Sequence, residues 1–427
     1  MKAEQVKGLL QKESSVQLLE QMYGKGKAEE NAKRYEMAAE GFRKNFGDQE
    51  FEFFTSPGRT EIGGNHKDHN QGKILAGSVQ MDCVAAAAPS GTNSIRMISE
   101  TYKQDLVVDL DDLEPTAQTT GTLPLIRGVL AGLKARGFRL QGFNAYVTSN
   151  VIGGSGVSSS ASFEMLVCSI VDYLFNKETR DVVSYAKAGQ YAENKYWLKG
   201  SGLLDQMSCA VGGIITIDFA DAEEPALRKI NCNFDDLGLD LVIVNTGKGH
   251  ADLSEEYSAI PNEMKSVAAY FGKNVLVETD EQEVIAHAKD IRRKCGDRAL
   301  LRAFHFFEES KRVDKQVAAL EKGDKAEFLK EITASGNSSW KWLQNCYLNE
   351  TPEEQSITCA LALTELYLDR IGDGACRVHG GGFAGVIAAF LPKEHTADYC
   401  AYINRAFGED SAFVMHIRNQ GAIHVEL

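Results

Sequence analysis

The sequence of 427 residues has no excess of basic charge. It holds 46 Lys and Arg against 60 Asp and Glu, which gives a formal net charge of −14. Nucleic acids and anionic membrane surfaces are bound by basic patches, so neither is expected as a partner. Nucleotides remain possible, because they need only local positive charge. The length indicates two or three domains.

Paired cysteines and long apolar runs are also missing. The nine cysteines are odd in number and include no C-x-x-C pair, which disfavours a disulfide framework or a zinc site and favours reduced thiols. No apolar run is long enough to span a bilayer, and Met1–Val6 leads to no signal-peptide core. We therefore expect a cytoplasmic protein with no membrane partner.

Two familiar phosphate-binding patterns are absent as well. No Gly-Lys pair is followed by Ser or Thr as in a Walker A loop, and no H-R-D or D-F-G of a protein kinase occurs. Glycine itself is abundant, with 39 residues, and it gathers in three segments that carry most of the polar side chains of interest.

The first glycine-rich segment is Ser56–Gly72, directly after an apparent strand at Phe51–Phe54. Glycine and proline set special backbone angles where a chain bends or approaches a ligand, so the pattern predicts a loop. That loop would present a dense set of polar side chains: Arg59, Glu61, Asn65, His66, Asp68 and His69. From these residues alone, a polar turn and a binding site are both open.

The second segment, Gly153–Ser162, lies between a strand predicted at Phe143–Thr148 and a helix predicted at Phe163–Phe175. Small residues let backbone N–H groups converge on an anion, and the N-terminus of the helix adds unpaired donors and a positive dipole. This position predicts a phosphate cradle outside the P-loop class rather than a flexible linker.

The third segment contains G-x-G-x-x-G at Gly380, Gly382 and Gly385. No βαβ unit accompanies it, so a dinucleotide fingerprint is disfavoured. A tightly packed hairpin and a second glycine loop that closes on the same ligand are both open. Asp205 lies near a further glycine pair, Gly200 and Gly202, and on these residues alone a turn is favoured over a site.

Interspersed strands and helices predict an α+β fold. Residues 1–47 have helical periodicity, helices dominate from 261 to 371, and an acidic, proline-bearing stretch after residue 220 indicates a domain boundary.

Taken in order, the segments resemble the galactokinases of the GHMP small-molecule kinase superfamily. Gly58–Asn70, here the signature segment, is similar to the galactokinase signature; Gly154–Ser162, the phosphate loop, is similar to the GHMP phosphate loop; and Gly380–Gly385 is similar to the third GHMP motif. The resemblance implies an N-terminal domain like ribosomal protein S5 domain 2 (42–220) and a ferredoxin-like C-terminal domain (221–427). Residues 1–41 would be an additional helical extension.

The resemblance also implies roles for individual residues. Asp205 and Arg59 would be catalytic, and Ser159 and Glu193 would hold Mg²⁺, with Glu193 lying 12 residues before Asp205 (205 − 193). The implied sugar contacts are Asn65, His66, Asp68 and Tyr257. The implied ATP phosphate contacts are Gly154, Ser155, Gly156, Val157, Ser158, Ser159, Ser160, Gly381 and Gly382.

The implied activity is transfer of the γ-phosphoryl group of ATP, with Mg²⁺, to the anomeric hydroxyl of D-galactose. Asp205 could take the hydroxyl proton, or Arg59 could lower the hydroxyl pKa while Asp205 orients it. The partners would be a small sugar and ATP, and the oligomeric state stays open, with a monomer compatible.

Three departures from the family pattern bear on the substrate. Asn65 stands where the family usually has glutamate, His69 where tyrosine is common, and Ile152 where proline is usual. Asn65 leaves open another sugar, such as N-acetylgalactosamine or a galactose-containing sugar. A catalytically silent galactose sensor is a further alternative, which the intact Ser160-Ala161 pair, Arg59, Glu193 and Asp205 disfavour.

Overall fold

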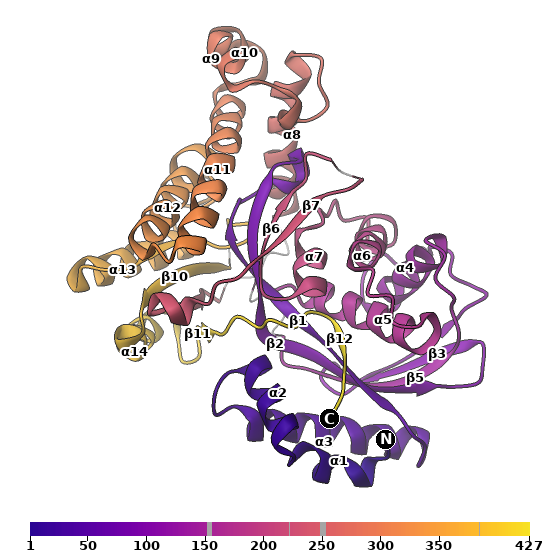
Figure 1. The fold of residues 1–427 in the computed structure, drawn as a ribbon. Coiled ribbons are helices and arrows are strands. Elements are labelled where there is room, and N and C mark those ends of the chain that lie inside the picture. The colour runs from indigo at the N-terminus through magenta and orange to yellow at the C-terminus, as the bar shows by residue number, and fades with distance from the viewer. Residues whose placement is uncertain (152–155, 222, 248–252, 384) are drawn as a thin grey trace.

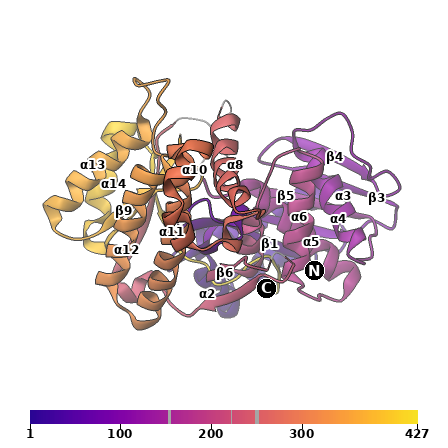
Figure 2. The same cartoon turned by 90° about the horizontal axis from the view of Figure 1, so that it is seen from above.

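The computed structural model describes residues 1–427 except 152–155, 222, 248–252 and 384. In the described chain the strands form two sheets, which lie in separate lobes (Figures 1 and 2). The larger sheet has eight strands: β1 (Glu52–Gly63), β2 (Lys73–Pro89), β3 (Ser94–Ser99), β4 (Gln104–Asp109), β5 (Phe143–Ser149), β6 (Ile214–Asp218), β7 (Ala226–Ile230) and β12 (Ile423–Val425). Its main path runs β12-β1-β2-β5-β3-β4, and β6 joins β7 to β2.

The first half of the predicted loop Ser56–Gly72 is in fact strand. β1 continues to Gly63 and pairs antiparallel with β2, with register shifts between Pro57 and Arg59 and between Glu61 and Gly63. The sequence did not indicate this strand, because the stretch lacks the alternation of apolar and polar residues that is typical of a half-buried strand. Only 64–72 forms a loop, which includes a short 3₁₀ turn at Asp68–Asn70.

Four helices pack against one face of the larger sheet. They are α4 (Thr122–Ala135), α5 (Ser159–Asn176), α6 (Val182–Lys195) and α7 (Leu204–Val211). Side chains of α4, α5 and α6 share one apolar core with Phe54, Ala85 and Ala87 of β1 and β2. α5 begins inside the predicted phosphate loop, four residues earlier than its apolar periodicity indicated.

The N-terminal helices cover the opposite face of the same sheet, as Figure 1 shows beneath β1 and β2. These helices are α1 (Ala3–Leu10), α2 (Glu13–Tyr23) and α3 (Ala28–Phe46). They form a second core with Phe53, Val84 and Ala86, whose side chains alternate with those of the first core. Burial on both faces explains why Val84–Ala88 is a continuous apolar run. The predicted extension is thus an integral layer.

The second lobe is built on a four-stranded antiparallel sheet in the order β11-β8-β10-β9, the order of a ferredoxin-like domain, as predicted. Its strands are β8 (Leu239–Asn245), β9 (Ala375–Val378), β10 (Val386–Pro392) and β11 (Ala412–Met415). Its helices are α8 (Ser254–Tyr270), α9 (Glu281–Ala286), α10 (Ala288–Cys295), α11 (Asp297–Lys322), α12 (Lys325–Ser338), α13 (Ser356–Ile371) and α14 (Thr396–Phe407).

The chain crosses between the lobes more than once. The predicted boundary at residue 220 separates the two sheets except for β7 and β12, which follow it in sequence yet belong to the larger sheet. β12 pairs with β1, so the C-terminus returns to the N-terminal lobe (Figure 1). None of the described helices combines the length and apolar character needed to cross a membrane.

A buried carboxylate joins the N-terminal helices to the sheet and to the returning C-terminal segment. Asp82 of β2 is fully buried and forms ion pairs with Arg34 of α3 at 2.8 Å and with Arg418 at 2.7 Å. Tyr23 of α2 donates a hydrogen bond to the same carboxylate at 2.6 Å. Burial works to raise the pKa of Asp82, but the two arginines outweigh it and lower that pKa.

Replacing this carboxylate should destabilise the fold strongly. Asp82→Asn keeps the side-chain shape but leaves two arginines without their counter-charge, so the free energy of unfolding should fall by about 3 to 5 kcal/mol. Urea denaturation, monitored by circular dichroism, measures this change. Asp48→Asn, at an exposed ion pair with Lys2, is the control and should change it by less than about 1 kcal/mol. A loss below about 1 kcal/mol for Asp82→Asn would contradict the role of the cluster.

Candidate active site

Arg59 of β1 joins three segments that lie far apart in the sequence. Its Nε and Nη2 atoms each lie 2.7 Å from Oδ1 of Asp205, and its Nη1 donates to the carbonyl oxygen of Gly156. The arginine is 7% exposed. The two residues predicted as catalytic therefore form one ion pair beside the phosphate loop.

Asp205 lies in the first turn of α7, where the unpaired N–H groups and the helix dipole favour a negative charge. Ser158 donates a hydrogen bond to its Oδ2. Burial works to raise the pKa of Asp205, but the charge of Arg59 and the hydrogen bonds from Arg59 and Ser158 outweigh it and lower that pKa. Its side chain is still 32% exposed, so an ionised carboxylate is open to a substrate.

The described part of the phosphate loop is shaped to present the N-terminus of α5. Gly156 has φ +74°, and an added Cβ there would lie 2.6 Å from Val386 Cγ2, so only glycine fits. The backbone N–H of Arg59 donates to Val157 at 3.0 Å, and Ser158 precedes the first residue of the helix. Gly154 and Ser155, also predicted as phosphate contacts, lie outside the described residues.

Glu193 of α6 faces the first turn of α5. Its Oε1 accepts a hydrogen bond from Ser160 at 2.9 Å, and its side chain is 3% exposed. The predicted metal pair was Ser159 and Glu193, yet the hydroxyl that meets Glu193 is that of Ser160. Both serines also line a neighbouring cavity, and the role of Ser159 as a metal ligand stays a prediction.

Two further charged groups lie close to Glu193. Lys199, on the connection between α6 and α7, places its Nζ 3.1 and 3.2 Å from the two carboxylate oxygens. Burial works to lower the pKa of Lys199, but the negative charges of Glu193 and Asp205 outweigh this effect and raise that pKa. Burial, and then the charge of Glu193, raise the pKa of Glu164 well above its ordinary value. A raised pKa favours the neutral form of Glu164.

In the described chain, no group of three or more His, Cys, Asp or Glu side chains is placed to hold a metal ion. Glu193 and Ser160 nevertheless offer a carboxylate and a hydroxyl oxygen, the hard donors that Mg²⁺ prefers. The residues fit a Mg²⁺ ion that takes its other ligands from phosphate oxygens and water.

Asp68 of the signature segment lies against the turn that leads to Asp205. A Cβ added to Gly202 would come 1.7 Å from Asp68 Oδ2, so the carboxylate fits only because residue 202 is glycine. The structure therefore brings a predicted sugar-binding carboxylate against Gly202, three residues before the predicted catalytic Asp205 (205 − 202).

Two other predicted sugar contacts, His66 and Tyr257, meet the third glycine segment. His66 donates through Nε2 to the carbonyl of Gly381 at 2.8 Å, and the Tyr257 hydroxyl donates to that of Gly382 at 2.9 Å. Burial lowers the pKa of His66 to about 4. Gly381 and Gly382 thus lie against two residues that are predicted to contact the sugar, and phosphate contact by these glycines stays a prediction.

Asn65 is fully buried and its amide is occupied by protein partners. Its Nδ2 donates to Glu61 at 2.8 Å and to the carbonyl of Gly380 at 2.6 Å, while its Oδ1 accepts from Asn345 at 2.8 Å. A glutamate at this position could not donate to two acceptors. A direct contact between Asn65 and a sugar would require exchange of these partners.

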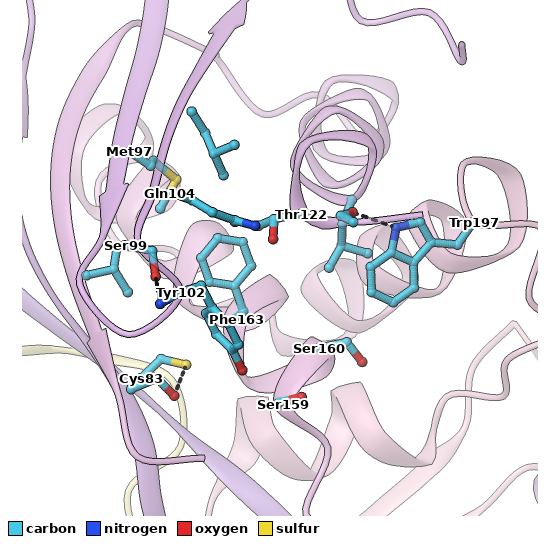
Figure 3. A pocket seen from close by; sticks show the side chains of 15 residues that line it. Cys83, Met97, Ser99, Tyr102, Gln104, Thr122, Ser159, Ser160, Phe163 and Trp197 are labelled. Atoms are coloured by element: carbon cyan, nitrogen blue, oxygen red, sulfur yellow. Dashed lines mark hydrogen bonds between the residues drawn. The ribbon is translucent and has the colours of Figure 1, made fainter. Parts of the chain in front are cut away.

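One functional feature that the sequence did not indicate is a cavity of about 240 Å³ beside the N-terminus of α5. Figure 3 shows aromatic side chains from three separate segments around it: Tyr102, Phe163 and Trp197. Trp197 is held by a 2.9 Å hydrogen bond from its ring nitrogen to the carbonyl of Gly121. Ser159 and Ser160 form its floor on the phosphate side. No motif marked it, because its lining residues come from segments that lie far apart in the sequence, from Cys83 to Trp197.

His379 is a second feature of the site that the sequence did not indicate. It is 1% exposed, and its Nε2 accepts from the backbone N–H of Glu61 at 3.1 Å. Burial, and then the charges of Arg59 and Arg377, lower its pKa well below the ordinary value. The lowered pKa favours a neutral imidazole beside the backbone of Glu61.

Comparisons with known proteins agree with this geometry. The family model described as the galactokinase galactose-binding signature matches residues 40–89, and the GHMP kinases N terminal domain matches residues 124–213. A galactokinase of Limosilactobacillus reuteri (strain DSM 20016) is 28% identical over 375 residues, which cover 84% of this chain and 92% of that protein. The galactokinase of Homo sapiens is 28% identical over 394 residues, with coverages of 90% and 95%.

Two solved structures are similar to this chain over most of its length. Lactococcus lactis galactokinase complexed with galactose superposes with a TM-score of 0.77 at 25% identity and covers 90% of this chain and 98% of its own. Methanococcus jannaschii mevalonate kinase gives a TM-score of 0.60 at 16% identity over 87% of this chain and 99% of its own, a likeness of fold.

The two-lobed fold and the α5 N-terminus at the phosphate loop define a GHMP small-molecule kinase. Within that superfamily the signature model, the two curated relatives and the galactose-bound structure are all of galactokinases, the family that the signature segment indicated.

Acid should destabilise the sugar side of the site through His305 of α11. This histidine is fully buried, donates through Nε2 to the carbonyl of Asn65 at 3.1 Å, and burial lowers its pKa to about 3. The unfolded chain, with a histidine pKa of about 6.5, therefore binds the proton first as the pH falls, which costs about 2 kcal/mol of folding free energy by pH 5.

Chemical denaturation at pH 7 and pH 5 tests this prediction. His305→Gln should lose less stability between the two pH values than the wild type does, by about 2 kcal/mol. His287→Gln, at an exposed histidine, should leave the difference unchanged. An unchanged difference for His305→Gln would show that this imidazole does not drive the acid sensitivity.

Proposed function

We propose that the protein transfers the γ-phosphoryl group of ATP to the anomeric hydroxyl of D-galactose and forms α-D-galactose 1-phosphate. The observation that carries this proposal is the Arg59–Asp205 pair, which is bonded to the phosphate loop through Gly156 and lies close to the signature residue Asp68. A cation, a carboxylate, a phosphate-binding helix terminus and a sugar-binding segment thus meet at one place.

The phosphates of ATP would bind at the N-terminus of α5, where unpaired N–H groups and the dipole of an 18-residue helix favour anions. Mg²⁺ would be held by Glu193 and Ser160, and it would supply charge neutralisation on the phosphate oxygens. Ser159 stays a predicted ligand, but the bonding of Ser160 to Glu193 favours the neighbouring hydroxyl.

Asp205 would orient the anomeric hydroxyl and accept its proton as the new P–O bond forms. A carboxylate with a lowered pKa is a weak base, so it cannot remove the proton well before phosphoryl transfer. Phosphoryl transfer passes through a loose transition state that needs little prior activation of the nucleophile. Arg59 would stabilise the charge that develops on the transferring group and hold Asp205 in place.

The sugar would lie against Asp68, His66 and Tyr257, on the Asp205 side of the signature segment. A glutamate at position 65 would bring a carboxylate to this place. In this chain the carboxylate belongs to Glu61, which accepts a hydrogen bond from Asn65 and pairs with Arg377 at 2.9 Å. This arrangement supports a galactose site rather than a differently shaped one, and no observation favours the sensor alternative. The cytoplasmic location and the oligomeric state stay predictions.

A sugar panel tests the substrate. Purified enzyme should release ADP rapidly with D-galactose and slowly with N-acetylgalactosamine, glucose and galactose-containing disaccharides. Asp205→Asn should lower turnover by a factor of about 10³, because it removes both the proton acceptor and the negative partner of Arg59. Nucleotide binding should persist, because the N-terminus of α5 is unchanged. Absence of galactose-stimulated ADP release from the wild type would overturn the proposal.

The adenine base would occupy the cavity lined by Tyr102, Phe163 and Trp197, since aromatic and apolar walls suit a flat ring. Thr122→Trp places a bulky ring in this half-buried lining position, so we expect the KM for ATP to rise about tenfold or more while the KM for galactose stays within about twofold. Thr116→Trp, at an exposed position, is the control and should leave both constants unchanged. Equal effects of Thr122→Trp on both substrates would place the base elsewhere.

A further inference from the structure

Lys199 occupies the side of Glu193 on which a divalent cation would have to bind. Its ammonium lies 3.1 and 3.2 Å from the two carboxylate oxygens, which is the bridging position of a single cation shared by both oxygens. In the described chain, no other lysine or arginine forms an ion pair with Glu193. The lysine therefore balances the charge of a carboxylate that is itself almost completely buried.

The connection between α6 and α7 is folded so as to keep the lysine there. The Lys199 N–H donates to the carbonyl of Glu193 at 3.0 Å, and the Lys199 carbonyl accepts from the N–H of Ser201 at 2.8 Å. Leu198, the residue before it, adopts φ +55°, a conformation that costs a non-glycine residue free energy. Backbone and side chain of Lys199 are thus both tied to Glu193.

The ammonium group of Lys199 can nevertheless move away from Glu193. Its side chain is 56% exposed, whereas that of Glu193 is 3% exposed, so the stem can rotate into solvent while the carboxylate stays in place. An ammonium and a Mg²⁺ ion cannot both bridge the same two oxygens, because their charges repel at contact distance. Binding of metal at Glu193 therefore requires displacement of the lysine.

We propose that Lys199 is a placeholder for the divalent cation: it holds Glu193 before nucleotide binds and excludes free metal, so that metal enters together with the phosphates. The inference rests on the assignment of Glu193 as a metal ligand under the proposed function. A divalent ion alone must compete with the lysine, whereas an ion that arrives on ATP gains phosphate ligands and the N-terminus of α5 as well. The lysine thereby favours entry of the metal–nucleotide complex over entry of the bare ion.

Binding of Mn²⁺ to the nucleotide-free enzyme, followed by the electron paramagnetic resonance signal of free Mn²⁺, tests the proposal without any measurement of activity. Lys199→Met should bind Mn²⁺ roughly tenfold more tightly than the wild type, since the competing cation is gone. Lys199→Gln should behave in the same way. Lys195→Met makes the same change of charge at an exposed position at the end of α6 and should leave Mn²⁺ affinity unchanged.

The double variant Lys199→Met/Glu193→Gln separates the two claims. If it loses the tightened site, Glu193 is the ligand and the placeholder role is supported. If both Lys199 variants bind Mn²⁺ no more tightly than the wild type, the placeholder role is overturned, while galactose-dependent ADP release by the wild type still supports the proposed function. If the double variant keeps the tightened site, Glu193 is not the metal ligand, and both the metal assignment and the inference fail.

Discussion

The ion pair between Arg59 and Asp205 is the interaction on which the organisation of the site depends. It joins residues 146 positions apart, and the same guanidinium reaches Gly156, 97 positions from Arg59. Burying such a pair is costly unless its remaining donors and acceptors are satisfied. The carbonyl of Gly156 and the hydroxyl of Ser158 do this, so the phosphate loop, β1 and α7 stabilise one arrangement together.

The same strand also attaches the second lobe. Two residues after Arg59, Glu61 forms a buried ion pair with Arg377, whose Nη1 donates to the carbonyl of Ile62 at 2.9 Å. Asn65 and Asn345 continue the contact four residues later. One continuous segment thus carries Arg59, which is bonded to the phosphate loop, at one end and the residues predicted to bind the sugar at the other. The latter part of the segment is hydrogen-bonded to the second lobe, so a movement of the lobes would act on it directly.

Sequence reasoning found the fold class, the family and the residues of the Arg59–Asp205 pair, because these follow from local motifs and their order. It failed where the answer depends on helix phase and on contacts across the fold. Each residue of an α-helix turns by about 100°, so whether Ser159 or Ser160 meets Glu193 depends on where α5 begins. Ser56–Gly63 was predicted as loop because its strand pairing lies in β2. The aromatic cavity and His379 have no local pattern that could have indicated them.

Asp82 has a consequence for the first forty residues of the chain. Its backbone N–H donates to the Asn150 side chain at 2.7 Å, and the Asn150 N–H donates back to the Asp82 carbonyl at 3.2 Å. Asn150 lies just ahead of the phosphate loop. The helices that the sequence predicted as an additional extension therefore provide, through Arg34, one of the two positive partners of Asp82. Asp82 in turn holds the backbone that leads into the predicted phosphate loop. Loss of these helices would remove one of the two arginines that pair with Asp82, although the helices lie on the opposite face of the sheet from α5.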